Sequence, residues 1–81
     1  MMLKVKLFAA AKQRVGRAEV ELELPEIATV GQLRSELAEQ FPPLADLLRH
    51  TRIAVNSDYA QDALALAPNC EIALIPPVSG G

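Results

Sequence analysis

The sequence closes with Glu71-Ile72-Ala73-Leu74-Ile75-Pro76-Pro77-Val78-Ser79-Gly80-Gly81. The first five of these residues form an apolar run of strand length. The two prolines that follow lack a backbone N–H and favour an extended path, and the two glycines remove side chains from the end. This ending therefore predicts a strand followed by six extended residues. At ~3.3 Å per residue they would carry the C-terminus up to roughly 20 Å from the folded domain. An ordinary frayed C-terminus is the alternative, because Pro, Ser and Gly are common there.

The beginning of the chain predicts another strand, over residues 3–8. Apolar and basic side chains alternate there, so that Leu3, Val5 and Leu7 share one face. Phe8 falls on the otherwise polar face. It is either covered by a neighbouring loop or part of an exposed contact patch.

Residues 9–24 predict a helical turn followed by a second strand. Alanine, lysine and arginine favour the turn over 9–15, and Gly16 is suited to end it. Residues 18–24 then alternate strictly between glutamate and apolar side chains until Pro25. We expect an antiparallel hairpin with a long connection. Its three glutamates form either a solvated face or an acidic docking surface.

The main helix is predicted to begin after Thr29. This threonine is a suitable N-cap, and Gln32 three residues later completes a capping box. An apolar stripe at helical spacing follows and consists of Val30, Leu33, Leu37 and Phe41. Pro42 and Pro43 end the helix, and residues 44–49 favour a second short helix.

The third predicted strand covers residues 52–56, with Ile53 and Val55 facing inward. Asn56-Ser57-Asp58 is typical of a turn, and a short irregular segment containing Tyr59 is expected after it. Leu64 and Leu66 are expected beneath the next loop. Pro68 and Asn69 form another turn before the last strand.

This order of elements predicts an α+β fold in which one main helix packs across a mixed sheet of four to five strands. The first and last strands have no tight hairpin partner, and a common solution places them side by side and parallel at the centre. That arrangement is the β-grasp, or ubiquitin-like, fold. We expect residues 1–75 to form this domain and residues 76–81 to form a flexible Gly-Gly tail.

Composition excludes several classes of function. A formal net charge of -2 argues against a nucleic-acid partner, because phosphate binding needs a basic face. No apolar run approaches the ~18 residues of a membrane span, and the N-terminal alternation does not resemble a signal peptide. The single cysteine, Cys70, excludes an internal disulfide and fits a reducing compartment. We therefore expect a cytoplasmic protein without a membrane association.

The inventory of reactive side chains is also small. One histidine and one cysteine do not provide the ligands of a zinc site, so no metal is expected. His50 is interpreted as a surface or capping residue. Cys70 is interpreted as structural. A nucleophilic cysteine needs a base or a positive charge nearby that favours the thiolate, whereas the negative charge of the neighbouring Glu71 disfavours it.

The chain resembles the small subunits of molybdopterin synthase, ubiquitin-like sulfur carriers of the MoaD/ThiS family. The opening strand Lys4-Val5-Lys6-Leu7-Phe8-Ala9 and the pair Val55-Asn56 before a polar turn are similar to the family pattern. The ending over residues 71–81 carries most of the resemblance. One departure is that Pro68-Asn69-Cys70 replaces the usual Gly-containing turn. Asn can adopt the left-handed conformation that Gly supplies, so we expect the turn to survive.

The resemblance implies a non-catalytic sulfur carrier. In such a carrier an E1-like enzyme uses ATP and magnesium to adenylate the carboxylate of Gly81, and a sulfur donor such as a cysteine desulfurase converts it to a thiocarboxylate. That sulfur is delivered to precursor Z, a cyclic pyranopterin monophosphate, in molybdenum cofactor biosynthesis. The implied partner is the large subunit of molybdopterin synthase, in a heterotetramer of two small and two large subunits. No cofactor is implied for the carrier itself.

The resemblance also implies roles for particular residues. Pro76, Pro77, Val78, Ser79 and Gly80 would enter the partner active sites, while Phe8, Tyr59 and Ile75 would form the docking patch. Independently, Ile75 is out of phase with Ile72 and Leu74. A carrier for thiamine, tungsten cofactor or cysteine synthesis and a ubiquitin-like protein modifier remain as alternatives.

Overall fold

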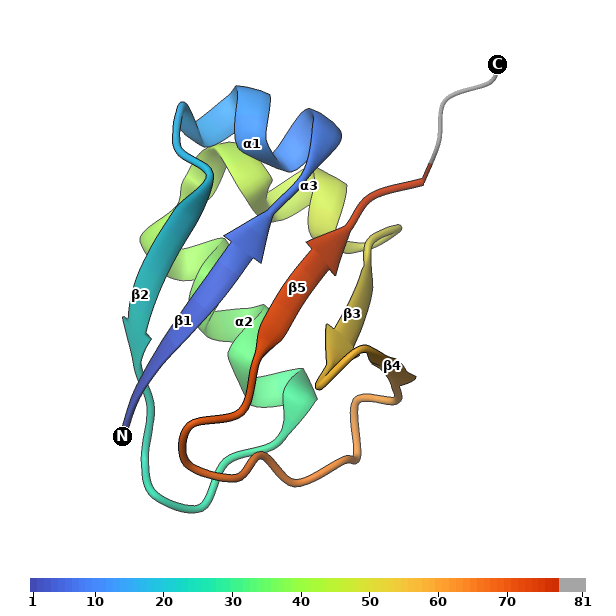
Figure 1. The fold of residues 1–81 in the computed structure, drawn as a ribbon. Coiled ribbons are helices and arrows are strands. Elements are labelled where there is room, and N and C mark those ends of the chain that lie inside the picture. Colours follow the sequence, from blue (N-terminus) through green and yellow to red (C-terminus); the bar gives the residue numbers. More distant parts are fainter. Residues whose placement is uncertain (78–81) are drawn as a thin grey trace.

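A five-stranded mixed sheet forms the centre of the fold (Figure 1). The computed structural model describes residues 1–77. Its elements are, in chain order, β1 (Met2–Leu7), α1 (Ala9–Val15), β2 (Glu19–Glu23), α2 (Val30–Gln40), the 3₁₀ turn η1 (Pro42–Leu44), α3 (Ala45–Leu48), β3 (Arg52–Val55), β4 (Asp58–Ala60) and β5 (Ile72–Ile75).

The strand order is β2-β1-β5-β3-β4. Strands β1 and β5 are parallel neighbours at the centre, and every other pairing is antiparallel. The predicted adjacency of the first and last strands is therefore confirmed. Because parallel strands run the same way, β1 and β5 end at one edge of the sheet, where Phe8 and Pro76 respectively follow (Figure 1).

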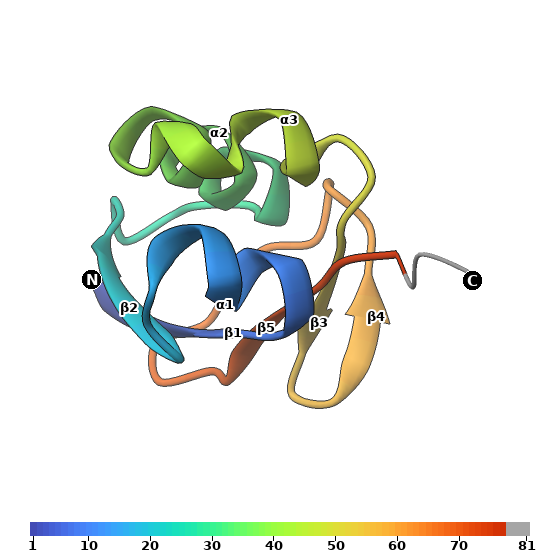
Figure 2. The same cartoon turned by 90° about the horizontal axis from the view of Figure 1, so that it is seen from above.

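One face of the sheet carries the core. Helices α2 and α3 lie on the same side of the sheet in Figure 2, and within residues 1–77 no helix covers the other face. Alternation places Leu3, Val5 and Leu7 on the covered face, where they are buried. Val30, Leu33 and Leu37 of α2 are buried against them, and Phe41 is partly buried. The predicted helical stripe and strand faces are confirmed.

Several local predictions are also confirmed. The Thr29 hydroxyl accepts from the N–H of Gln32 at 3.2 Å, and the Gln32 side chain accepts from the N–H of Thr29 at 2.8 Å. Gly16 ends α1 with a φ of 81°, and Asn69 adopts a φ of 64° in the turn before β5. Asparagine tolerates this left-handed region better than most residues, so the turn forms without glycine.

Two local predictions are wrong. Tyr59 lies in strand β4 rather than in an irregular segment, because Asn56 and Ser57 both adopt positive φ and close a tight hairpin between β3 and β4. Leu64 is 45% exposed, since a turn in which its N–H donates to the carbonyl of Gln61 holds it at the surface. Only Leu66 reaches the core.

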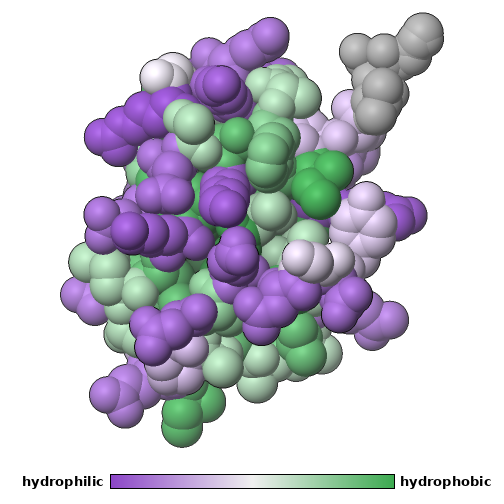
Figure 3. Space-filling model, viewed as in Figure 1, coloured by the Kyte–Doolittle hydropathy of each residue, from purple (hydrophilic) through white to green (hydrophobic). Residues whose placement is uncertain are grey.

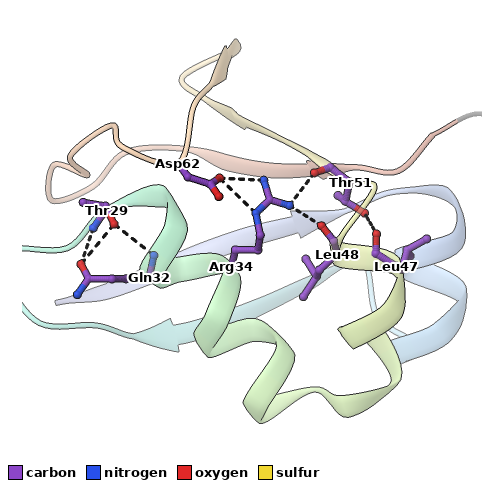
Figure 4. A network of polar contacts seen from close by, with 7 residues as sticks. All are labelled: Thr29, Gln32, Arg34, Leu47, Leu48, Thr51 and Asp62. Atoms are coloured by element: carbon purple, nitrogen blue, oxygen red, sulfur yellow. Dashed lines mark hydrogen bonds and ion pairs between the residues drawn. The ribbon is translucent and has the colours of Figure 1, made fainter.

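A polar network joins α2 to the beginning of β3 (Figure 4). Nη1 of Arg34 donates to the carbonyl oxygens of Leu48 and Thr51, and Nη2 lies 3.1 Å from the Asp62 carboxylate. The buried Thr51 hydroxyl donates to the carbonyl of Leu47 at 2.7 Å. One side chain therefore holds together α2, the end of α3, the start of β3 and the turn around residue 62.

Replacing Arg34 with methionine is expected to lower the free energy of unfolding by about 1–3 kcal/mol, because two carbonyl oxygens each lose a hydrogen bond from the guanidinium and Asp62 loses its ion pair. Urea denaturation of the variant measures this loss. Arg14→Met is the matched control, since among residues 1–77 Arg14 donates only to one exposed carbonyl, that of Pro43. Its loss should stay within roughly 0.5 kcal/mol. Equal losses in the two variants would contradict the role given to Arg34.

Candidate functional site: an apolar patch on the open face of the sheet

The open face of the sheet, opposite α2, brings together residues that are far apart in the chain. Strand register aligns Lys6 of β1 with Ala73 of β5, Ala73 with Ala54 of β3, and Ala54 with Tyr59 of β4. Residues directly opposite each other on neighbouring strands point to the same face. These side chains therefore form one row across four strands.

A shallow depression lies along this row. Its centre contains the small side chains of Ala54 and Ala73, and the larger side chains of Phe8, Tyr59 and Ile75 stand around them. Phe8 is 49% exposed and Tyr59 is 60% exposed. We call these five residues the open-face patch. The three residues singled out from the sequence thus line a single surface depression.

Sequence reasoning missed the two alanines of the open-face patch. A signal for them was present, because Ala54 and Ala73 each lie between two apolar residues and so occupy the opposite face of their strands. Small side chains at these positions leave the space between the aromatic rings open. The depression can therefore receive an apolar side chain from another protein.

The other half of the open face is charged. Alternation exposes Lys4 and Lys6 on β1 beside the three glutamates of β2, at positions 19, 21 and 23. Lys6 pairs with Glu71 at 3.4 Å along the border of the open-face patch. Figure 3 shows a group of apolar side chains at the upper centre-right of this face, with polar side chains to their left and below them. An apolar centre with a polar rim is the usual composition of a protein interface.

The C-terminal segment begins at the border of the open-face patch. Strand β5 ends at Ile75, Pro76 is buried and Pro77 is exposed. The remaining positions of the predicted tail, Val78, Ser79, Gly80 and Gly81, lie outside the described residues. The last residue of the patch is thus separated from the first of these positions by only the two prolines.

The reactive side chains of the described residues do not converge on this face. Cys70 is buried in the core cluster, as its structural interpretation requires, and His50 is exposed at the surface. Residues 1–77 contain no group of three or more His, Cys, Asp or Glu side chains placed to hold a metal ion. In the same residues, no helix is long and apolar enough to cross a membrane. The described part of the chain offers a binding surface.

The model of the ThiS family matches residues 5–81. The chain belongs to the ThiS family. A relative from Arabidopsis thaliana, named molybdopterin synthase sulfur carrier subunit, is 34% identical over 79 residues and aligns with 98% of this chain and 82% of its own length. The family resemblance predicted from residues 71–81 is therefore confirmed.

Solved structures agree with this ThiS-family assignment. The chain superposes with a TM-score of 0.88 on the SAMP1 crystal structure from Haloferax volcanii, at 30% identity and with 100% of both chains covered. A putative molybdopterin converting factor, subunit 1, from Pyrococcus furiosus gives a TM-score of 0.84 at 31% identity, covering 96% of this chain and 99% of the other. The predicted β-grasp fold is confirmed by the strand order and by these two neighbours.

Proposed function

We propose that this ThiS-family chain is the sulfur-carrier subunit of molybdopterin synthase and is not catalytic on its own. The main evidence for this proposal is that a relative named molybdopterin synthase sulfur carrier subunit aligns with almost the whole chain. The fold supports the proposal, because its last strand leads from an apolar patch directly toward a Gly-Gly end. We place the protein in the cytoplasm, where its single buried thiol is compatible with reducing conditions.

The proposed chemistry resides on the carboxylate of Gly81. A carboxylate is a poor electrophile, so an E1-like enzyme first joins it to AMP, using ATP and magnesium and releasing pyrophosphate. A sulfur donor, such as the persulfide of a cysteine desulfurase, then displaces AMP, and one carboxylate oxygen departs with the AMP phosphate. A thiol reduces the acyl disulfide formed in this way, becomes part of a disulfide itself, and releases the thiocarboxylate. The resulting thiocarboxylate supplies the sulfur nucleophile to precursor Z. This chain needs no cofactor of its own for these steps.

The composition of residues 76–81 suits a terminus that enters two different active sites. Glycine lacks a Cβ, so Gly80 and Gly81 fit a narrow channel and accept unusual φ values. The restricted backbones of Pro76 and Pro77 reduce the conformational entropy lost on insertion. In this proposal Val78 makes an apolar contact, and Ser79 provides a hydroxyl for hydrogen bonding.

We further propose that the open-face patch docks the large subunit of molybdopterin synthase. Phe8, Tyr59 and Ile75 would surround a side chain of that subunit while the tail enters its active site. Exposed aromatic side chains around a small depression are typical anchors of protein interfaces. Two small and two large subunits would form the complete synthase.

Intact mass tests the proposed function. The chain is incubated with the activating enzyme, ATP, magnesium and a sulfur source, and its C-terminal peptide is then analysed. The expected gain equals one exchange of oxygen for sulfur, confined to that peptide. An unchanged mass would contradict the carrier function, whereas isopeptide adducts on lysines in cells would indicate a protein modifier. Conversion of precursor Z with the large subunit then separates molybdopterin synthesis from the other sulfur pathways.

Replacing Phe8 with alanine is expected to weaken binding of the large subunit by about tenfold or more, which is typical of an aromatic anchor. The free energy of unfolding should change by less than roughly 1 kcal/mol, because the side chain is half exposed in the free protein. Calorimetric titration and urea denaturation measure the two effects. Met2→Ala is the control, since Met2 is an exposed apolar residue at the other end of β1 and lies outside the patch. A large stability loss with unchanged binding would contradict the docking role.

A further inference from the structure

Arg52 occupies a distinctive place beside the start of the tail. It is the first residue of β3 and lies opposite Ile75, the last residue of β5. Its side chain therefore shares the open face with the open-face patch. The guanidinium carbon lies 4.9 Å from the centroid of the Tyr59 ring. An exposed arginine is thus held on an exposed aromatic ring next to the point where the chain leaves the sheet.

The positive charge of Arg52 has no carboxylate partner within residues 1–77. The three ion pairs of this part of the chain join the N-terminus to Glu23, Lys6 to Glu71 and Arg34 to Asp62. Lys6, the other basic residue that borders the patch, is therefore already paired. The exposed residues just before the strand add no acidic group, since Arg49 and His50 precede Thr51.

Stacking on Tyr59 prepares Arg52 for an external carboxylate. A guanidinium that lies over a ring is held by cation–π attraction and keeps the N–H groups at its edge free to donate. These donors match the two oxygens of a carboxylate in a bidentate geometry. When a partner covers the neighbouring apolar side chains, water is excluded and the attraction between the two charges becomes stronger.

The length of the tail indicates where a carboxylate that binds Arg52 would lie on the partner. An extended segment of six residues spans up to ~20 Å, so in an inserted tail the reacting group lies far from Arg52. In a complex with the tail inserted, Arg52 would therefore face the partner's surface around the entrance that admits the tail. A desolvated charge pair at that position slows dissociation, which suits a lasting subunit contact more than a brief activation encounter.

We infer that Arg52, seated on Tyr59, binds an aspartate or glutamate side chain of the large subunit at the entrance of its tail channel, and so contributes to the choice of partner. This inference rests on the proposed function. It adds a charged contact to a docking surface that is otherwise apolar, and it identifies the chemistry of the matching residue.

Binding of the large subunit to Arg52 variants tests the inference. Arg52→Gln is expected to raise the Kd about tenfold or more at low salt, Arg52→Lys less, and Arg52→Glu most. Raising the salt concentration should weaken the wild-type complex more than the Arg52→Gln complex, because the pair is ionic. Arg49→Gln is the matched control and should bind within about twofold of wild type. Replacing the matching acidic residue of the large subunit with lysine should partly restore the affinity of Arg52→Glu.

The outcomes separate this inference from the proposed function. If the wild-type chain accepts sulfur and binds the large subunit while Arg52→Gln binds equally well, the inference is wrong and the proposed function stands. An affinity loss with unchanged salt dependence would also overturn it, because the arginine would then act through its aliphatic stem. If the wild-type chain does not bind the large subunit at all, both the proposed function and the inference fall. Thermal denaturation of each variant verifies that it is folded.

Discussion

Deletion of Gly81 is expected to abolish sulfur transfer and to leave the free energy of unfolding unchanged. The deletion moves the terminal carboxylate back by about one residue, or ~3.3 Å in an extended chain. A misplacement of even ~1 Å at a reacting centre can lower a rate by roughly 100-fold, so this shift exceeds what the chemistry tolerates. The described core is built from side chains between Leu3 and Leu74, and a glycine has no side chain to add to it.

Gly81→Ala provides a milder form of the same experiment. It keeps the length of the chain and adds one Cβ, which a channel suited to glycine would have to accommodate. We expect strongly reduced thiocarboxylate formation and sulfur delivery, both followed by mass and by conversion of precursor Z. Glu39→Ala is the control, since Glu39 is exposed on α2, away from the tail and the open-face patch, and this variant should retain the activity. Normal sulfur delivery by the deletion variant would show that Gly81 does not carry the sulfur.

Replacing Leu74 with alanine is expected to cause the largest loss of stability among the changes considered, about 3–5 kcal/mol. Leu74 has no exposed surface and lies at the centre of the sheet between Leu7 and Ile53. Deleting its side chain leaves a cavity that the surrounding strands and α2 cannot close completely. Because small domains have total stabilities of only about 5–15 kcal/mol, the variant should be substantially unfolded at moderate urea concentrations.

The next residue along β5 provides a matched comparison for Leu74→Ala. Ile75 has a side chain of the same size but lies on the open face and is only partly buried. Ile75→Ala should therefore cost about 1 kcal/mol or less in unfolding free energy, and it should weaken binding of the large subunit instead. Urea denaturation and binding measurements on both variants test this division of roles. Equal losses of stability would mean that the open face is part of the core.

Many of these features could be predicted because each depends on residues close together in the chain. The alternation in β1 and β2, the capping box of Thr29 and the left-handed Asn69 are local properties of the backbone and its nearest side chains. Strand β4 was not predicted, since three residues are too few to establish a period. The exposure of Leu64 was not predicted either, because it depends on a turn with no periodic signal.

The candidate site was only partly predictable for the same reason. Phe8 could be singled out because it is apolar on an otherwise polar face of its strand. Ile75 could be singled out because it is out of phase with the buried residues Ile72 and Leu74. Tyr59 was proposed through the family resemblance, and its neighbour Ala54 was not proposed at all. The position of Arg52 over the Tyr59 ring depends on the hairpin between β3 and β4, which brings their side chains into contact.

Local sequence patterns are enough to assign the buried faces of β1, β2 and α2, the start of the main helix and the turns at Asn56 and Asn69. The sheet pairing, in contrast, is needed to show that Phe8, Arg52, Tyr59 and Ile75 meet on one surface. The physical reason is that a period of two assigns each side chain to a face but does not say which strand lies next to it or in which register. Parallel pairing of β1 with β5, and antiparallel pairing of β5 with β3, supply that information. The sheet therefore brings side chains from β1, β3, β4 and β5 together beside Pro76, where the predicted tail begins.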